Sequence, residues 1–338
     1  MPRFLSRLPI DGYLLALIGM VVLAALLPAS GQGAVVMDVV VKVAIALLFF
    51  LYGARMSPAA IAAGLMHWRL QGTVFLSTFL LFPLLGLGLV FLMRGSLQPD
   101  LLTGMMFLCL LPSTVQSSIA FTSIAGGNVP GALTSASLSN LIGVVVTPLL
   151  VALLIGSAGG SAGGGIHLQS ILDIGLQILA PFAVGQLCRP LLLGWLTRHA
   201  KLTGLVDRGS ILLIVYAAFS EGMVAGVWSH VAPADLAKVI GLNIVLLGLV
   251  LGLTLLAGRA LKFDRPDRIV ILFCGSKKSM ASGIPMAGIL FASASVPLIV
   301  LPIMLFHQIQ LFACTIIAQR YARENAARLK DEPQIEAY

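Results

Sequence analysis

Long apolar runs follow one another along almost the whole chain, and this feature constrains the fold more than any other. A transmembrane helix needs about 20 consecutive, mostly apolar residues. Runs near that length lie at Tyr13–Ala29, Val35–Gly53, Gln71–Met93, Leu101–Gly126, Gly131–Gly156, Leu168–Cys188, Ser210–Ser229, Asp235–Gly258, Ile269–Ser293 and Val296–Gln319. The sequence therefore predicts an all-α polytopic membrane protein with ten transmembrane helices, which satisfy their backbone hydrogen bonds internally.

The composition excludes several functional classes. Only 10% of the 338 residues are charged, whereas a soluble domain carries about 25% charged residues. Soluble enzymes and nucleic-acid modules are thereby excluded, so the expected surroundings are a lipid bilayer and nucleic acid is not an expected partner. The four cysteines lie far apart within apolar stretches and without metal-binding spacing, so we predict neither disulfides nor a zinc site.

The distribution of Lys and Arg predicts the orientation of the spans. With the N-terminus placed in the cytoplasm, sixteen Lys and Arg residues fall in inside segments. The outside segments hold Arg94, and Lys238 lies at the start of the eighth span. Because Lys and Arg accumulate in cytoplasmic loops, we predict an integral protein of the plasma (inner) membrane with both termini in the cytoplasm.

A glycine-rich stretch near the midpoint, Gly156–Gly165, separates five spans from five. Its composition is typical of a flexible linker. An odd number of spans in each half gives the halves opposite orientations, which is the pattern of an inverted-topology repeat. The predicted units are a first repeat at 1–165, a second repeat at 166–319 and a cytoplasmic tail at 320–338.

Helix breakers and hydroxyl side chains interrupt the fourth and ninth spans near their middles. The fourth span contains Pro112, followed by Ser113, Thr114, Gln116, Ser117 and Ser118. The ninth contains Gly275, Ser276, Lys277, Lys278, Ser279, Ser282, Gly283 and Pro285. One such break is explained by a simple proline kink. Two breaks at corresponding places in the two halves instead favour the substrate site of a transporter.

Lys277 and Lys278 are two adjacent charges in the ninth span. A charge at the centre of a span costs about 2.5–3.5 kcal/mol on insertion scales and usually marks function. Consecutive helical positions diverge by about 100°, so both side chains point the same way only where the helix is unwound. We expect one lysine to face the crossing of the two broken helices and the other to reach a cavity or snorkel.

Two further sets of charged residues lie within spans. Glu221 in the seventh span needs a cationic partner or a proton, and we pair it with Lys277 or Lys278. Asp38 and Lys42 are four residues apart, which predicts an intrahelical ion pair with a structural role.

The fifth span is rich in hydroxyl residues, namely Thr134, Ser135, Ser137 and Ser139, followed by Asn140. Small and hydroxyl side chains let helices approach closely, so packing explains most of them. Asn140 has an amide that needs several partners, and we expect it to help line a cavity near the fourth span.

Two runs resemble the bile acid:sodium symporter family, and most of all its sodium/bile-acid-symporter-like (SBF-like) branch. These are Cys109–Leu150, which begins CLLPSTVQSS, and Phe273–Ala287, FCGSKKSMASGIPMA; the segment YAAFSEG around Glu221 is also similar. The resemblance implies an inverted 5+5 fold with a panel at about 13–53 and 168–229 and a core at about 71–156 and 235–319. The broken fourth and ninth spans cross at the centre of that core.

The same resemblance implies where ions bind. Ser117 and Ser118 match a sodium-binding pair of the bile-acid carriers, and Ser137, Ser139 and Asn140 lie near the hydroxyls of the fifth span that hold the ion there. A sodium site is thereby implied at Ser117, Ser118, Ser139 and Asn140. The carboxylate that the carriers use in the ninth span is replaced here by Ser276, and two lysines follow. An ammonium in the place of sodium favours proton coupling or uncoupled exchange.

The sequence thus predicts a secondary active transporter, not an enzyme, for a small or amphipathic organic anion. It works by alternating access, with sodium or a proton as coupling ion and no other cofactor. The predicted binding residues are Pro112, Gln116, Ser117, Ser118, Ser137, Ser139, Asn140, Glu221, Ser276, Lys277, Lys278 and Ser279. Two alternatives stay open: an intramembrane hydrolase with a Ser–Lys dyad at positions 276–279, and a membrane receptor that does not transport.

Overall fold

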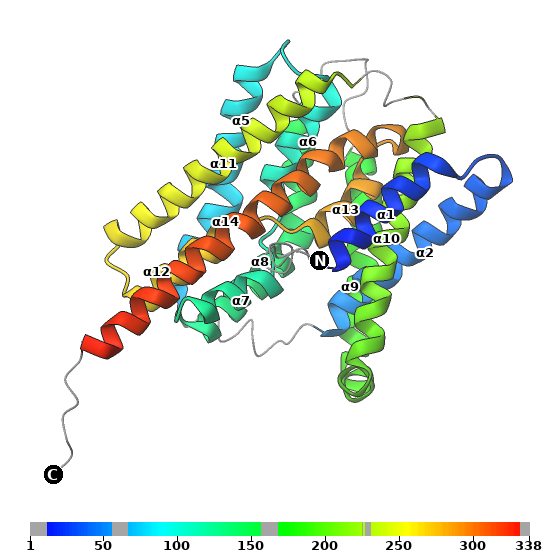
Figure 1. Cartoon of the computed structure of the whole chain (residues 1–338). Coiled ribbons are helices and arrows are strands. Elements are labelled where there is room, and N and C mark those ends of the chain that lie inside the picture. The colour runs from blue at the N-terminus through cyan, green and yellow to red at the C-terminus, as the bar shows by residue number, and fades with distance from the viewer. Residues whose placement is uncertain (1–11, 56–66, 157–167, 225, 227–230, 332–338) are drawn as a thin grey trace, which may run out of the picture.

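A computed structural model of the chain describes residues 12–55, 67–156, 168–224, 226 and 231–331 (Figure 1). Within these ranges the regular structure is helical and no strand occurs. Seven helices there are long and apolar enough to cross a membrane: Gln32–Arg55, Trp68–Met93, Val129–Ile155, Leu179–Arg198, Ala200–Val224, Pro233–Ala260 and Val296–Asn325. The prediction of an all-helical membrane protein is confirmed.

The first half of the chain begins with α1 (Gly12–Leu26) and α2 (Gln32–Arg55). A long rod follows, made of α4 (Trp68–Leu76), the π-helical turn η2 (Ser77–Leu81) and α5 (Phe82–Met93). The next elements are α6 (Pro99–Leu110), α7 (Gln116–Ile124) and α8 (Val129–Leu150), which ends in a second π-helical turn, η3 (Val151–Ile155). Most of the predicted linker, residues 157–167, lies outside the described residues.

The second half begins with α9 (Leu168–Arg198), α10 (Ala200–Val224) and α11 (Pro233–Ala260). The short helices α12 (Arg265–Gly275) and α13 (Met280–Leu290) follow, then a 3-10 turn, η5 (Ser293–Ser295), and α14 (Val296–Asp331). Helix α14 runs past Gln319 without a break, so the first part of the predicted tail is a continuation of this helix.

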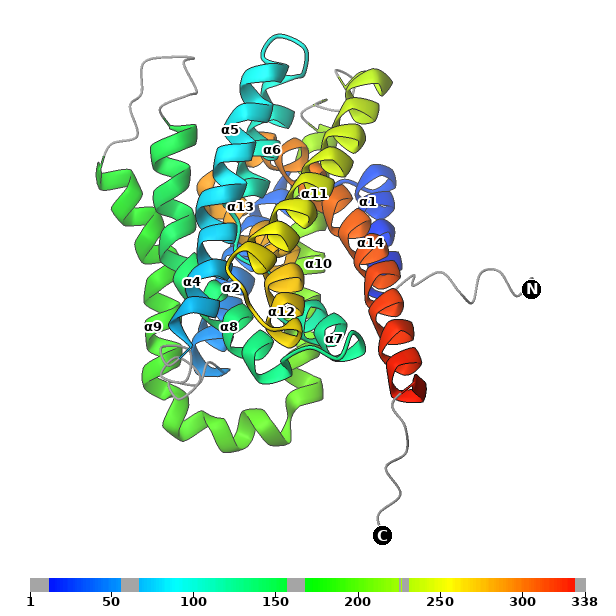
Figure 2. The same cartoon turned by 90° about the vertical axis from the view of Figure 1, so that its left-hand side faces the viewer.

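The helices pack in two groups (Figures 1 and 2). The four-helix group comprises α1, α2, α9 and α10, in which α2 packs on α9 and α1 on α10. A Cβ atom added at Gly53 of α2 would lie 2.0 Å from the carbonyl oxygen of Phe182 in α9. Small residues thus allow the two backbones to touch, as is usual between membrane helices.

The crossing group comprises α4 to α8 and α11 to α14, with the broken pairs α6–α7 and α12–α13 inside it. Helix α6 packs on α14, where a Cβ atom at Gly104 would lie 2.5 Å from the carbonyl oxygen of Ile299. The two groups meet where α10 contacts α13 and α14 and where α9 contacts α8 and α13. A boundary therefore runs between them, and the cavity described below lies on it.

Candidate functional site

The fourth predicted span is broken between α6 and α7, at residues 111–115. Helix α6 ends at Leu110 because Pro112 cannot continue the hydrogen-bond ladder. The Pro112 ring packs on α8 at Gly143, where an added Cβ would lie 2.7 Å from the Pro112 Cβ. The break was predicted from the proline, and its close fit to α8 depends on the absence of a side chain at Gly143.

The carbonyl groups freed at this break accept hydrogen bonds from side chains of other helices. The Leu110 carbonyl accepts from Thr147 Oγ1 of α8 at 2.8 Å. The Ser113 carbonyl accepts from Asn140 Nδ2, also of α8, at 2.7 Å, and the Ser113 N–H donates to Ser139 Oγ at 3.0 Å. The predicted residues Ser139 and Asn140 therefore hold the first break in place.

The ninth predicted span is broken between α12 and α13, at residues 276–279. Its freed carbonyls are capped in the same way. The Leu272 carbonyl accepts from the Ser276 hydroxyl at 2.5 Å, and the Phe273 carbonyl accepts from that of Ser118 at 3.1 Å. The Cys274 carbonyl accepts from the Ser113 hydroxyl at 2.6 Å, and the Gly275 carbonyl accepts from that of Ser77 at 3.2 Å. Buried carbonyls without donors are costly, so these hydroxyls make the break tolerable at membrane depth.

The two breaks are joined directly. The Ser279 N–H donates to the Pro112 carbonyl at 2.8 Å. Ser282 Oγ of α13 donates to Asn140 Oδ1 of α8 at 2.8 Å. Ser279 Oγ caps α13 by accepting from the Ser282 N–H at 3.2 Å. The meeting of the two broken helices, which the sequence predicted, is present in the structure.

Lys278 is one of the two lysines at this crossing. It is 1% exposed, and its Nζ donates to three carbonyls, of Thr78 at 2.8 Å, Cys109 at 2.9 Å and Leu111 at 2.7 Å. Its Nζ also lies 4.1 Å from the ring centroid of Phe82. Lys278 thus satisfies all three of its ammonium donors and ties the end of α6 to the second break.

Lys277 has very different surroundings. It is fully buried, and its Nζ has no hydrogen-bond partner. It lies 4.0 Å from the centroid of the Phe121 ring and 5.3 Å from that of Phe273. Residues 276–279 are not helical, which lets the adjacent lysine side chains turn to different partners. One of the two lysines was expected to snorkel or reach a cavity, and Lys277, the one that does not bond the crossing, is instead enclosed between aromatic rings.

The remaining predicted residues near the breaks lie on α7 and α8. Gln116 is exposed at the start of α7, and Ser137 is half-buried on α8. The oxygens predicted to hold sodium are engaged within the protein. Thr114 Oγ1 lies 2.8 Å from Ser117 Oγ and 3.0 Å from Ser118 Oγ, Ser139 Oγ accepts from the Ser113 N–H, and Asn140 Oδ1 accepts from Ser282 Oγ. These four residues therefore do not present an open ring of oxygen ligands.

The serines considered for a Ser–Lys dyad bond to other groups. Ser276 Oγ donates to the Leu272 carbonyl, and Ser279 Oγ lies 3.0 Å from Ser282 Oγ. The Lys278 ammonium is directed to carbonyls, and the Lys277 ammonium has no hydrogen bond. A hydrolytic dyad needs a hydrogen bond between the hydroxyl and its base, and the structure does not form one here.

The predicted ion pair of Glu221 with Lys277 or Lys278 is wrong for this structure. Lys277 Nζ has no hydrogen-bond partner, and the partners of Lys278 Nζ are carbonyls. Glu221 is on α10 in the four-helix group, whereas both lysines are enclosed in the crossing group. Proximity across helices cannot be read from the order of the residues, which is why the sequence could not fix this partner.

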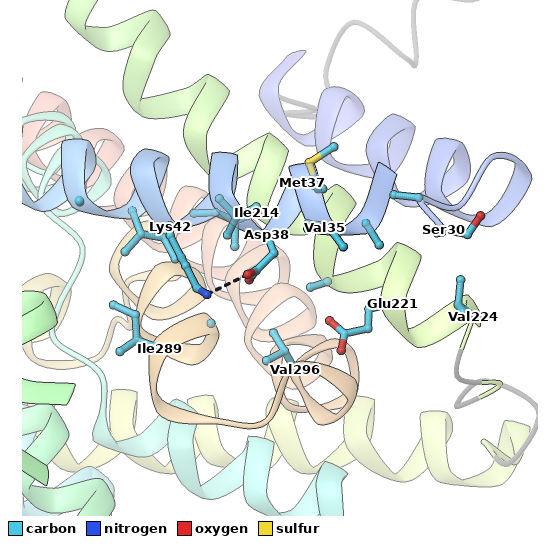
Figure 3. Close-up of a pocket in the computed structure, with 18 of the residues that line it drawn as sticks. Ser30, Val35, Met37, Asp38, Lys42, Ile214, Glu221, Val224, Ile289 and Val296 are labelled. Carbon is cyan, nitrogen blue, oxygen red and sulfur yellow. Dashed lines mark hydrogen bonds and ion pairs between the residues drawn. The ribbon is translucent and has the colours of Figure 1, made fainter. Parts of the chain in front are cut away.

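Glu221 instead lines a cavity of about 1230 Å³ at the boundary of the two helix groups. Asp38 and Lys42 of α2 line it too, and their predicted ion pair is confirmed, with Lys42 Nζ 2.8 Å from Asp38 Oδ2. Figure 3 shows the carboxylates of Asp38 and Glu221 directed into the space between α2 and α10. Gly288, Ile289 and Val296 close the cavity from the crossing group.

Sequence reasoning missed several residues that hold the crossing. Thr78 and Thr147 were not singled out, although one supplies a carbonyl to Lys278 and the other caps α6. Gln310 of α14 was also missed. Its side chain bonds both the N–H and the carbonyl of Lys278, each at 3.0 Å. A lone glutamine in an apolar span was the available signal, because a buried amide needs partners.

Comparison with known proteins identifies the kind of protein to which this geometry belongs. Residues 11–323 match the SBF-like CPA transporter family. The chain is 50% identical over 335 residues to "Uncharacterized protein PA2026" of Pseudomonas aeruginosa, covering 98% of each chain. It is 46% identical over 315 residues to "Putative symporter YfeH" of Escherichia coli (strain K12), covering 93% of this chain and 94% of that one. It is 28% identical over 348 residues to sodium/bile acid cotransporter 7-B of Xenopus laevis, covering 98% of each.

Proposed function

Because the chain belongs to the SBF-like CPA transporter family, we propose that it is a secondary transporter that moves a small or amphipathic organic solute by alternating access. The observation that carries this proposal is the pair of broken helices joined at Pro112 and Ser279. Broken backbone at membrane depth occurs where protein buries it or where it lines a pathway. Paired breaks are the usual setting of a transporter's binding site.

The proposal includes the architecture expected from the sequence. The chain would cross the membrane ten times as a 5+5 inverted repeat, with both termini in the cytoplasm and the protein in the inner membrane. The four-helix group would be the panel and the crossing group the core. Support comes from the separate packing of these two groups and from the position of the broken pairs within one of them.

The solute would bind in the cavity at the boundary between the groups. Its volume of about 1230 Å³ is ample, since pockets for small organic ligands have about 300–1,000 Å³. The expectation of an anionic solute rested on the family resemblance, on the N-termini of the half-helices and on the charges of Lys277 and Lys278. Both ammonium groups are buried, and neither residue lines this cavity, so the lysines give no reason to expect an anion there.

We assign coupling to a proton and give Lys277 the central role. A buried ammonium without hydrogen bonds has only the electrostatic attraction of aromatic rings to offset its lost hydration. Loss of its proton therefore breaks no hydrogen bond, whereas Lys278 would have to give up bonds to three carbonyls. The hydroxyls of Ser118 and Ser139 are hydrogen-bonded within the protein and Asn140 Oδ1 accepts from Ser282, which argues against a sodium ion at the implied site.

Flux measurements on the purified, full-length chain in proteoliposomes test this function. Labelled bile salts, simpler organic anions and organic amines are offered while sodium and proton gradients are imposed separately. We expect uptake of at least one solute that depends on the pH gradient and is unchanged when potassium replaces sodium. We expect the Lys277→Met variant to lose the pH dependence. Absence of flux for every solute would refute transport, and strict sodium dependence would refute the coupling.

A further inference from the structure

A cationic patch lies where α11 ends and where α4 and α12 begin. It consists of Arg69 at the start of α4, Arg259 and Lys262 at the end of α11, and Arg268 in α12. Arg69 Nη2 donates to the Leu261 carbonyl at 3.0 Å. The Arg268 side chain packs on Gly258, where an added Cβ atom would lie 3.0 Å from its Cγ. Because α12 also packs on both α4 and α11 (Figure 2), the four cations gather around one helix end.

The charges of this patch are not balanced by acidic side chains. Among the residues that the structure describes, no carboxylate forms an ion pair with any of the four cations. The two carboxylates beside them bond other groups: Asp264 Oδ1 accepts from the Asp267 N–H at 3.0 Å, and Asp267 Oδ1 accepts from Asn128 Nδ2 at 2.8 Å. In sequence, residues 56–66, which precede α4, include no acidic residue. The patch therefore carries an excess of positive charge.

The backbone at Lys262 is unusual. The end of α11 is a Schellman turn, in which the Phe263 N–H donates to the Gly258 carbonyl at 3.1 Å and the Lys262 N–H donates to the Arg259 carbonyl at 3.0 Å. Lys262 has a φ of 56° and is the only residue other than glycine with a positive φ in the described ranges. Glycine is the usual residue at this position because it has no Cβ to clash. The helix end alone would favour glycine, so a lysine kept in a strained conformation here points to a role for its charge.

The patch lies at the ends of two helices that are long and apolar enough to cross a membrane. One begins at Trp68 and the other ends at Ala260, and the ends of such helices lie at the depth of the lipid headgroups. Trp68 is 71% exposed and Leu261 is 46% exposed, and an exposed tryptophan at the end of a span is typical of the membrane interface. A soluble anion would contact only the cations. A phospholipid has a phosphate for the cations and acyl chains for the apolar side chains.

We propose that the cationic patch binds the headgroup of an anionic phospholipid, whose phosphate accepts hydrogen bonds from Arg69, Arg259 and Lys262. Arg69 can bind a phosphate without releasing the Leu261 carbonyl, because a guanidinium has several further N–H donors. Each Lys or Arg near an anionic membrane surface strengthens binding by about fivefold. This interaction goes beyond the proposed transport function and does not depend on it.

Thermal unfolding of the purified, full-length chain tests the proposal. Mixed micelles of detergent with phosphatidylglycerol, an anionic lipid, are compared with mixed micelles that contain phosphatidylcholine, whose headgroup has no net charge. A ligand of the folded chain raises the melting midpoint, and we expect phosphatidylglycerol to raise it by about 4 °C more than phosphatidylcholine does. Equal midpoints in the two lipids would overturn the proposal. An equal rise with sn-glycerol 3-phosphate would also overturn it, because the ligand would then be a soluble phosphate.

Variants test the assigned residues. Lys262→Gly and Arg259→Gln are each expected to raise the phosphatidylglycerol concentration that gives half the maximal shift by about fivefold. In phosphatidylcholine, Lys262→Gly should melt no lower than the parent chain, since glycine adopts a φ of 56° without strain. Lys201→Gln is the matched control, because it removes an exposed cation near the start of α10, outside the patch. A parent-like lipid response in the double variant Lys262→Gly/Arg259→Gln, or an equal loss of response in Lys201→Gln, would overturn the assigned site.

Discussion

Removal of the Lys278 ammonium is the most direct test of how the crossing is held together. Lys278→Met keeps nearly the same length and volume but has no donor. The carbonyls of Thr78, Cys109 and Leu111 would each lose a hydrogen bond of 2.7 to 2.9 Å. All three of these residues are fully buried, so water cannot replace the lost donor.

The loss of folding stability expected for Lys278→Met can be worked out from these three hydrogen bonds. A buried acceptor left without a donor costs about 1–3 kcal/mol, so three of them cost about 3–9 kcal/mol. Part of this is offset because the variant no longer buries a charge, which costs several kcal/mol per ion. We expect a net destabilisation of about 3 kcal/mol. For Lys277→Met, loss of the cation–π contacts costs about 2 kcal/mol of stability. Because this variant also no longer buries a charge, the gain in stability equals or exceeds that loss.

The two variants form a matched pair in a thermal unfolding assay in detergent. Lys278→Met is expected to lower the melting midpoint by about 6 °C, while Lys277→Met leaves it unchanged or raises it. Adjacent residues of identical chemistry would then differ only through their hydrogen bonds. Equal destabilisation by both substitutions, or a stable Lys278→Met protein, would refute the assignment of Lys278 as the group that caps the break.

Two further predictions concern glycines. Gly53→Ala is expected to destabilise the protein by about 2 kcal/mol or more, because the new Cβ would lie 2.0 Å from a backbone oxygen of α9. Gly72→Ala has nothing within 4 Å of its Cβ and lies inside α4, so this variant should melt at or slightly above the temperature of the parent chain. Gly288→Trp is expected to abolish solute uptake by filling the cavity, since a Cβ there meets only ordinary contacts with Ile45 and Ile214 at 3.6 and 3.9 Å. Gly241→Trp is the control, because a Cβ at Gly241 has nothing within 4 Å and Gly241 does not line the cavity, so solute uptake should be unchanged.

The sequence predicted the breaks but not what holds them. Proline at 112 and the glycine and hydroxyl run at 275–279 are local signals, and both breaks occur where these signals lie. The donors that cap them, Thr147 and Gln310, are distant along the chain. Each is a single polar residue among apolar neighbours, and only the packing of α8 and α14 shows which carbonyl it reaches.

The charged residues of the cavity also include one contact that the local sequence predicted and one that it did not. The spacing of Asp38 and Lys42 was enough to predict their ion pair, because residues four apart share a helix face. Glu221 was singled out as a carboxylate within a span and lines the cavity, but its partner was misassigned to the lysines of the ninth span. The partner of Glu221 depends on which helices lie next to α10, and the hydropathy of the sequence does not determine how the helices are arranged.

The arrangement of donors bears on how the protein would move. The side chains that cap the two breaks come from within the crossing group, from η2, α7, α8, α14 and the breaks themselves. The cavity, in contrast, is lined from both groups, with Asp38 and Glu221 on one side and Gly288 and Val296 on the other. Sliding one group against the other therefore changes the cavity and leaves the caps intact, as in rigid-body transitions about an interface. A solute shifts such an equilibrium only through different contacts in the two states. A solute in this cavity that contacts α2 and α10 as well as α13 and α14 has that property, because its contacts bridge the boundary.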